Sequence, residues 1–349
     1  MAHQKGRGAL ANVHNRFAKT VSEFDFLGEP ENKLVTTLHR ETSKRIIATN
    51  NSPDVPFEQS INPYKGCEHG CIYCYARPTH AYLDLSPGLD FETEIFYKPD
   101  AAQLLERELA DKNYRCSPIN LGANTDPYQP VERELGITRQ LLETCLRYQH
   151  PVTIVTKGAL VVRDLDLLSE LAGNNLCSVC ISVTTLDNSL KRIMEPRTAS
   201  PATRLRVITA LADVGIPVAV LYAPVIPAIN DSELEAILKA VKDAGVDSAG
   251  YVFLRLPLEV KPLFYAWLEQ HFPDRKQHVI NLVRAARAGR DYDTRFGKRM
   301  RGEGVFADLI EQRFTLSCKR LGLNVRERPE LDSHRFKPPV RKNEQLGLF

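Results

Sequence analysis

The feature that most constrains the fold is an alternation of short apolar runs with helical patterns between residues 57 and 257. Each run has the length of a strand and is bounded by turn residues. Between the runs, apolar side chains recur at helical spacing, and glycines such as Gly215 mark helix ends. Strands that alternate with helices predict βαβ units on a parallel sheet, and hence an α/β fold. The expected strands are residues 57–62, 119–123, 152–156, 177–183, 218–223 and 251–256.

Two of the expected helices have recognisable first residues. Ser200 and Pro201 supply an N-cap and a first-turn proline, while Ser232 and Glu235 have the spacing of a capping box. Right-handed crossovers between successive parallel strands curl such a sheet, and six units leave the barrel open. We therefore predict a partial (β/α)6 barrel in residues 57–257, with ligand-binding loops after the carboxyl ends of its strands.

The regions on either side of the barrel differ from it. Residues 1–56 are polar and basic without strong periodicity, which predicts a partly ordered lead-in. Residues 258–323 return to a helical pattern and predict a helical basic C-terminal extension. Residues 324–349 are rich in proline and charge, which predicts a flexible tail.

Composition excludes several classes of protein. The chain has 349 residues, of which 43% are hydrophobic and 26% charged, the balance of a globular protein. It contains neither a long apolar run nor the apolar stretch of a secretory signal, which predicts a cytoplasmic protein that does not enter a membrane. Eight cysteines are too few for a disulfide scaffold at this length, so a close group of them indicates metal ligation.

Basic charge is concentrated near the C-terminus. Residues 275–342 hold 18 Lys and Arg against 8 Asp and Glu, although the net charge of the whole chain is only +3. Clustered Lys and Arg attract nucleic acid through counterion release. The alternative is a solvated helical surface followed by an Arg-rich tail, and the sequence leaves both open.

Three cysteines directly follow the first expected strand and therefore lie at the barrel mouth. Cys67, Cys71 and Cys74 fall within eight residues, and Gly66 and Gly70 permit the chain to wrap tightly. Three thiolates suit several irons of one cuboidal iron-sulfur cluster but cannot ligate all four irons. We expect one iron without a protein ligand, open to chemistry.

A zinc site is the alternative for the same loop. Its fourth ligand would be His69 or His80. Zinc sites usually pair ligands as two separated C-x2-C units. The chain has one further C-x2-C, Cys177 and Cys180, but alternation within an expected strand points these side chains to opposite faces.

The C-x3-C-x2-C motif, with the aromatic Tyr73 before its last cysteine, resembles the signature of the radical S-adenosylmethionine (SAM) superfamily. The resemblance implies a [4Fe-4S] cluster whose open iron chelates SAM, and one-electron cleavage to a 5'-deoxyadenosyl radical. The superfamily's partial (β/α)6 barrel agrees with the six units found above. Residues 62–67, 74–77, 122–130, 156–157, 182–187, 195–197 and 223–227 further resemble the branch related to spore photoproduct lyase.

The resemblance also implies residues that bind the cofactor. Tyr73 belongs to the signature, and Asn124, Thr125 and Asp126 follow the second strand, where superfamily members bind the methionyl amino group. The polar turn at 124–126 could equally be a connector. Candidates for ribose or carboxylate binding, each with a packing or surface role as its alternative, are Ser182, Thr184 and Arg197.

Two residues are candidates for radical chemistry. Cys116 precedes the second strand at a place similar to that of the hydrogen-donating cysteine in spore photoproduct lyase, although the local sequence departs from that family's pattern. A cysteine at the start of a strand is more often a buried structural residue. Tyr75 is the second candidate because it directly follows Cys74.

The last five residues, Gln345 to Phe349, resemble the Gln-Leu-x-Leu-Phe peptide that docks bacterial proteins on the replication sliding clamp. A charged tether that presents two leucines and a phenylalanine suits an apolar groove. The alternative is a disordered end that happens to be apolar.

Three functional hypotheses follow. The first is a radical SAM enzyme, possibly of lyase type, that repairs or modifies nucleic acid and receives its electron from a flavodoxin- or ferredoxin-like donor. The second keeps the radical chemistry but takes a protein or small metabolite as substrate. The third is a zinc-stapled nucleic-acid-binding protein without catalysis.

Overall fold

The computed structural model describes residues 6–17, 35–325 and 330–340. Its main sheet has seven strands in the order β10-β9-β8-β7-β6-β3-β2. The six strands from β3 to β10 run parallel to one another, and β2 is antiparallel at the edge. Their bounds are β2 Ile47–Thr49, β3 Gln59–Ile61, β6 Ile119–Leu121, β7 Val152–Thr156, β8 Cys177–Ser182, β9 Val218–Val225 and β10 Ser248–Phe253.

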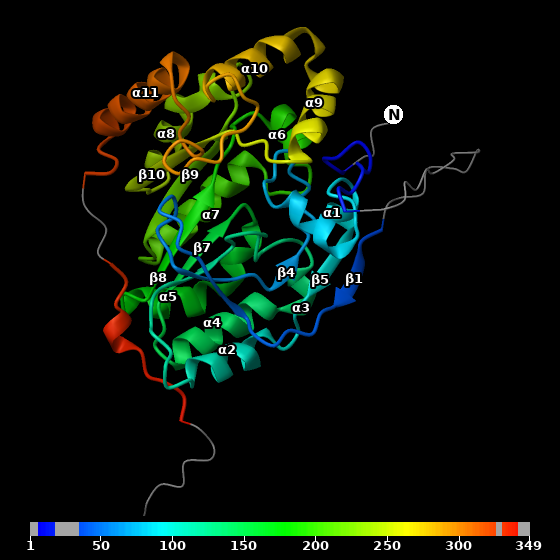
Figure 1. The fold of residues 1–349 in the computed structure, drawn as a ribbon. Helices are drawn as coiled ribbons and strands as arrows, with labels where there is room; N and C mark the ends of the chain where they lie inside the picture. Colours follow the sequence, from blue (N-terminus) through cyan, green and yellow to red (C-terminus); the bar gives the residue numbers. More distant parts are fainter. Residues whose placement is uncertain (1–5, 18–34, 326–329, 341–349) are drawn as a thin grey trace, which may run out of the picture.

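These strands confirm the six βα units that the sequence predicts. β2 and β10 lie at the two ends of the strand order, so the sheet is a partial barrel and does not close. The helices that connect or cover the strands are α2 Ala101–Leu109, α3 Glu132–Leu135, α4 Ile137–Arg147, α5 Leu165–Gly173, α6 Asn188–Met194, α7 Pro201–Asp213 and α8 Leu234–Asp243 (Figure 1).

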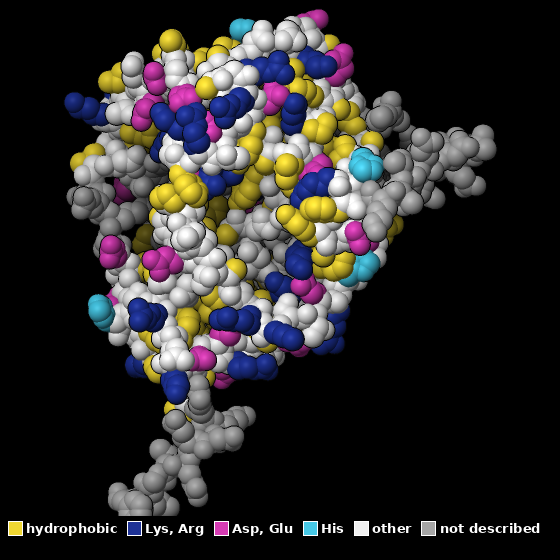
Figure 2. Space-filling view, viewed as in Figure 1, with side chains coloured by type: hydrophobic (Ala, Val, Ile, Leu, Met, Phe, Trp, Pro, Cys, Tyr) yellow, Lys and Arg dark blue, Asp and Glu magenta, His cyan; other side chains and the backbone are white. Residues whose placement is uncertain are grey.

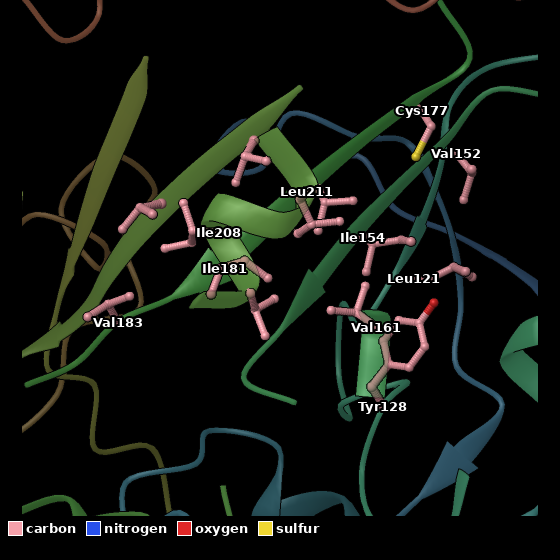
Figure 3. Close-up of a cluster of buried hydrophobic side chains, with 14 of the residues drawn as sticks. Leu121, Tyr128, Val152, Ile154, Val161, Cys177, Ile181, Val183, Ile208 and Leu211 are labelled. Atoms are coloured by element: carbon pink, nitrogen blue, oxygen red, sulfur yellow. The ribbon is translucent and has the colours of Figure 1, made fainter. Parts of the chain in front are cut away.

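Helix α7 shows why these segments form. The hydroxyl of Ser200 accepts a hydrogen bond of 3.2 Å from the backbone N–H of Thr203, and Pro201 occupies the first turn, as predicted. Ile208 and Leu211 then pack on the sheet against Ile181 (Figure 3).

The main hydrophobic core lies between the sheet and the helices. Alternate residues of each strand point to this core, for example Cys177, Val179 and Ile181 of β8 (Figure 3). Cys180 points to the opposite face and is partly exposed, so the two cysteines do not form a ligand pair. The core holds the strands in register and leaves their carboxyl ends free to carry polar loops.

One predicted helix cap is wrong, although the helical segment begins where it was expected. The chain enters α8 through the short 3-10 turn Asp231–Glu233, without a side-chain cap. Glu235, whose carboxylate the capping box would have used, forms an ion pair with Arg313 instead. The neighbouring Glu233 accepts hydrogen bonds from the Thr185 hydroxyl and the backbone N–H of Leu186.

A second, small sheet lies beside the main one. It consists of β1 Thr37–Arg40, β5 Glu94–Tyr97 and β4 Tyr64–Lys65. The turns η1 Arg77–Leu83 and α1 Asp90–Thr93 pack next to it (Figure 1). Part of the expected lead-in is therefore strand.

The region after β10 is helical, with α9 Val260–His271, α10 Pro273–Ala285 and α11 Val305–Leu321. α11 packs on α8, and the side chain of Trp267 in α9 donates a hydrogen bond of 2.9 Å to the carbonyl of Ile193. No helix within the described ranges is long and apolar enough to cross a bilayer.

Residues 330–340, which the sequence assigns to a flexible tail, lie along the barrel. Lys337 donates a backbone hydrogen bond of 2.9 Å to Tyr148, and the ring of Phe336 packs against Tyr114 and His150. We call residues 330–340 the strap. An apolar anchor within a charged segment accounts for its placement, and the predicted docking peptide Gln345 to Phe349 lies outside the described residues.

Candidate functional site

The loop that carries the three cysteines follows β3 and β4 at the carboxyl edge of the main sheet. Gln129, which comes after β6, binds both ends of the first turn of the cysteine loop. The Gln129 side chain accepts a hydrogen bond of 2.9 Å from Glu68 N–H and donates one of 3.2 Å to the carbonyl of Gly66. On the other side, Ile72 N–H donates to the carbonyl of Met194 at 3.1 Å. The loop is therefore held between the chain segments that follow β6 and β8.

The three thiols lie within electrostatic reach of one another in a dry environment. Cys67 and Cys71 are buried, and Cys74 is partly exposed. Burial raises the pKa of all three thiols, that of Cys71 to about 12, and the neighbouring sulfurs raise the pKa of Cys67 further. A bound metal centre would supply the positive charge that favours the thiolate form of these side chains.

A buried arginine shapes the inside of the loop. Arg77 donates hydrogen bonds to the carbonyls of Cys71 at 3.0 Å and Gly88 at 2.8 Å, and forms an ion pair of 2.5 Å with Glu92. Glu92 also accepts hydrogen bonds from the backbone N–H groups of Gly8 and Ala9 at 3.0 and 2.8 Å. The N-terminal segment thus closes over the loop.

Glycine is required where these segments meet. Gly70 has a φ of +66°, and a Cβ atom there would lie 2.7 Å from the Glu92 carboxylate. A Cβ atom on Gly8 would lie 1.7 Å from the carbonyl oxygen of Gly70. A side chain at either position would push the N-terminal segment off the cysteine loop.

A second buried network lies behind the cysteines. Glu195 pairs with Arg204 and accepts hydrogen bonds from Tyr73 and, at 2.6 Å, from Thr184. Burial opposes ionisation of Glu195, but the charges of Arg204 and Lys157 outweigh it and lower the pKa of the carboxyl to about 2. The predicted cofactor residues Tyr73 and Thr184 are brought together, with their hydroxyls bonded to this carboxylate.

The polar turn after β6 is mostly occupied by structural contacts. The buried carboxylate of Asp126 accepts hydrogen bonds from Thr156 at 2.6 Å and from Lys157 N–H at 2.7 Å, and lies 3.2 Å from His69. These partners overcome the effect of burial and lower its pKa to about 2. The Thr125 hydroxyl donates to the carbonyl of Tyr64 at 2.8 Å.

Two further predicted cofactor residues also have protein partners. The carbonyl of Ser182 accepts a hydrogen bond of 2.9 Å from Arg204, and the hydroxyl-bearing side chain is buried. Arg197 forms an ion pair of 3.0 Å with Glu68 in the cysteine loop. Ser182 therefore contacts the buried network behind the cysteines, and Arg197 contacts the cysteine loop itself.

Three side chains remain at the open face of the site. Tyr75 is 45% exposed, and its hydroxyl donates to the carbonyl of Ala123. The guanidinium of Arg255 lies 5.1 Å from its ring centre. The ammonium of Lys157 lies 5.8 Å from the ring centre of Tyr73 and lowers the pKa of Cys71 and Cys74 against the effect of burial. Asn124, the remaining candidate of the turn, is partly exposed beside Ala123.

Cys116 lies at the opposite end of the sheet. It precedes the amino end of β6, whereas the cysteine loop follows the carboxyl end of the parallel strand β3. Burial raises the pKa of its thiol to about 11, and Ser333 of the strap lies beside it. The structure therefore places Cys116 at the far end of the sheet from the cysteine loop.

The geometry also argues against a zinc site. His69 faces Asp126, and His80 lies 2.9 Å from the carbonyl of Glu94. Among the described residues, no three or more His, Cys, Asp or Glu side chains converge as ligands of a single metal ion. Three thiols in one short loop, without a histidine or carboxylate among the described side chains to complete a tetrahedral set, fit a sulfur-bridged cluster better than a single ion.

Comparison with known proteins decides the family. The model of the Radical SAM superfamily matches residues 61–241, which include all three cysteines and most of the sheet. The chain belongs to the radical SAM superfamily. An uncharacterized protein of Mycobacterium tuberculosis strain H37Rv is 37% identical over 236 residues, covering 67% of this chain and 69% of that protein. An uncharacterized protein of Methanocaldococcus jannaschii is 27% identical over 221 residues, covering 63% and 79%.

Solved structures place this radical SAM protein beside spore photoproduct lyase in fold. A variant of that lyase with bound AdoMet and dinucleoside spore photoproduct has a TM-score of 0.59 and 18% identity, covering 86% of each chain. A second variant has a TM-score of 0.60 and 16% identity, covering 89% of this chain and 87% of the other. The predicted resemblance is thus confirmed at the level of the fold.

Several residues that shape the site escaped sequence reasoning. Glu92, Gln129 and Arg204 have no motif of their own, and their partners are distant along the chain. The available signal was the family resemblance, which contained Arg77 and Glu195 without showing what they bind.

Proposed function

We propose that this protein is a radical SAM enzyme that acts on nucleic acid. The observation that carries the proposal is the dry three-cysteine loop at the carboxyl edge of the sheet, with Tyr75, Lys157 and Arg255 at its open face. Cys67, Cys71 and Cys74 would hold a [4Fe-4S] cluster. When bound, this cluster would pass one electron to SAM and so release the 5'-deoxyadenosyl radical.

The protein's own groups bind and orient the reactants. Lys157 is a cation close to Cys71 and Cys74 with no carboxylate ion pair among the described residues, and we assign it to the SAM carboxylate. Asn124 is the partly exposed member of the predicted turn and is assigned to the methionyl amino group. Tyr73, Thr125, Asp126, Ser182, Thr184 and Arg197 support the pocket walls through the hydrogen bonds described above.

Tyr75 is the residue assigned to contact the substrate. Burial raises the pKa of its phenol to about 12, so the hydroxyl stays protonated at neutral pH. The exposed ring of Tyr75 lies beside the cysteine loop, and its hydroxyl, which donates its proton to the carbonyl of Ala123, is placed to accept a hydrogen bond from the reacting nucleotide. A Tyr75→Phe variant is expected to turn over substrate more slowly while retaining bound iron.

Nucleic acid is favoured by two independent observations. The similar lyase structure contains a bound dinucleoside photoproduct. In this chain, basic residues concentrate in the C-terminal part, and Arg255 at the mouth has no carboxylate partner within the described ranges. Both suit a phosphate-bearing polymer.

The test is anaerobic reconstitution with iron and sulfide, followed by reductant, SAM and either DNA or RNA. We expect about four irons per chain and 5'-deoxyadenosine that forms faster with one polymer. A flavodoxin- or ferredoxin-like protein is the expected physiological donor. Cys71→Ser should lose the cluster, whereas Cys116→Ser, at the far end of the sheet, should retain it. Equal iron content in the two variants would contradict the proposal.

A further inference from the structure

A loop between α10 and α11 lies directly beside the mouth of the barrel. We call residues 290–301 the basic loop. Met300 accepts a backbone hydrogen bond of 2.8 Å from Phe253, the last residue of β10. The buried guanidinium of Arg287 joins the loop to the sheet, because it donates to the carbonyls of Lys298 at 2.7 Å and Leu254 at 2.8 Å. The loop is therefore fixed to the strand end that also carries Arg255.

The basic loop carries five cations and only two carboxylates. Arg295 forms ion pairs with Asp293 and Glu303. Lys298 also pairs with Glu303, and Arg299 pairs with Asp54. Figure 2 shows Lys and Arg side chains, with a few Asp and Glu, on this face over the region between α10 and α11. The cations are Arg290, Arg295, Lys298, Arg299 and Arg301, and the carboxylates are Asp291 and Asp293.

Two of these cations lie beyond ion-pair distance of any described carboxylate, although Arg290 still acts electrostatically on Asp293. Within the described parts of the chain, Arg290 and Arg301 form no ion pair. Arg301 instead lies over the ring of Tyr251, with its guanidinium carbon 4.0 Å from the ring centre. Their charge is left to attract an anion from outside.

Arg255 and Arg287 form a pair of cations at the base of the loop. Arg287 donates to the carbonyl of Leu254, the residue before Arg255, so the two arginines are neighbours. Burial, together with the charge of Arg255, lowers the pKa of Arg287 to about 10. Arg287 is 1% exposed, and the Nε atoms of both arginines are buried without a hydrogen-bond partner. Neither arginine forms an ion pair among the described residues, and Asp293 and Glu303 act on Arg287 only from beyond ion-pair distance, so the two guanidinium groups lack a direct counter-anion.

The surroundings of Arg255 indicate where that anion would sit. Its guanidinium lies 5.1 Å from the ring centre of Tyr75 and donates a hydrogen bond of 3.2 Å to the hydroxyl of Tyr292. The guanidinium therefore spans the gap between the cysteine loop and the basic loop. An oxyanion bound by Arg255 and Tyr292 would lie next to the proposed reaction site.

The basic loop also exposes an aromatic ring. Phe296 is 57% exposed, and the guanidinium carbon of Arg299 lies 4.6 Å from its ring centre. Asp54 holds this part of the loop, since it accepts a hydrogen bond of 2.6 Å from Gly297 N–H and pairs with Arg299. A fixed ring among cations is the arrangement on which unpaired bases stack.

We propose that the basic loop and Arg255 together bind an unpaired DNA strand, with one phosphate on Arg255 and a neighbouring base on Phe296. The strand would pass Tyr75, so that one nucleotide faces the cysteine loop. Arg290 and Arg301 would contact adjacent phosphates. This inference rests on the proposed function and specifies its substrate class and the direction from which the substrate enters.

The test is binding of a fluorescent 12-nucleotide single strand by anaerobic, cluster-loaded protein, measured by anisotropy at several salt concentrations. Phe296→Ala should weaken binding by about tenfold, because a stacked base is lost, and Phe296→Trp should restore it. Arg290→Ala and Arg301→Ala should each reduce the slope of log affinity against log salt by about 0.7. Arg255→Met should weaken binding at every salt concentration.

Arg335→Ala is the matched control. This exposed arginine lies in the strap at the amino end of the sheet and donates to Asn174 at 2.9 Å, so its loss changes the net charge equally without touching the mouth. We expect wild-type affinity and slope. Circular dichroism and iron content would verify that every variant is folded and loaded.

The outcomes separate the two proposals. If the wild-type protein binds neither DNA nor RNA, the nucleic-acid part of the proposed function fails. If it binds DNA but the four loop and mouth variants bind like Arg335→Ala, this inference alone is overturned. Binding of RNA more than tenfold tighter than the same DNA sequence would overturn the assignment to DNA.

Discussion

Two buried ion pairs stabilise the chain around the three cysteines. Arg77 and Glu92 lie within and beside the cysteine loop, and Glu195 and Arg204 lie behind it. All four side chains are almost completely removed from water. Because the arginines also donate hydrogen bonds to backbone carbonyls and the glutamates accept further ones, the pairs hold the loop in one conformation, and removing one member leaves an uncompensated buried charge.

Replacement of Glu195 tests this argument. Glu195→Gln removes the charge opposite Arg204 and is expected to lower the free energy of unfolding by about 3–5 kcal/mol. The control is Glu235→Gln, which removes the partner of Arg313 in a largely solvated pair and should cost at most about 1 kcal/mol. Urea unfolding of the iron-free proteins measures both values. Equal losses in the two variants would show that burial does not determine the importance of the Glu195 pair.

Elements that lie on the amino side of the sheet have a different role from those at the mouth. The strap covers this end, where Phe336 packs on Tyr114 and His150. Both ring nitrogens of His150 form hydrogen bonds. Nε2 bonds to the hydroxyl of Tyr114 at 2.6 Å, and Nδ1 bonds to the carbonyl of Pro151 at 2.9 Å. Burial lowers the pKa of this histidine to about 4, so it is neutral in the folded protein at neutral pH.

This burial makes stability depend on pH in a defined window. Because the folded pKa of about 4 lies below the ordinary value of 6.5, the unfolded chain binds the proton more readily. The stability that the folded protein gains from keeping His150 neutral is fully present above pH 6.5 and is lost as the pH falls toward 4. Between pH 7.5 and 5 the loss should be about 2 kcal/mol. His150→Asn cannot titrate, so urea unfolding at the two pH values should show a smaller acid loss than wild type, and parallel losses would contradict the assignment.

The elements also show what could be predicted from the sequence. All six parallel strands were predicted, because a strand buried by helices leaves an apolar run that turn residues delimit. The small strands β1, β2 and β4 could not be predicted, since they are two to four residues long and too short to show an alternation of apolar and polar residues. The positions of Cys116 and the strap depend on contacts between distant parts of the chain, such as Phe336 with His150.

At the scale of the whole molecule, the first and last described segments of the chain lie at opposite edges of one sheet. Residues 7–9 form hydrogen bonds with Glu92 next to the cysteine loop. The strap packs on the edge formed by the amino ends of the strands. The helical extension returns from β10 to the mouth and places the basic loop beside Arg255, whose guanidinium lies next to the ring of Tyr75. Parallel strands make this division possible, because all their carboxyl ends lie at one edge.

This architecture predicts how the protein responds to removal of iron. The sheet core and both buried ion pairs consist of protein atoms alone, so anaerobic chelation of the cluster should leave β7, β8 and β9 folded. The cysteine loop would lose the cluster that we propose its three thiols share, and three uncoordinated thiols offer no comparable cross-link between the ends of the loop. Hydrogen exchange should therefore accelerate in residues 66–76 and 7–9 and remain unchanged in the three strands. Loss of protection throughout the sheet would show instead that the cluster is required for the whole fold, and that the ion pairs cannot hold the barrel without it.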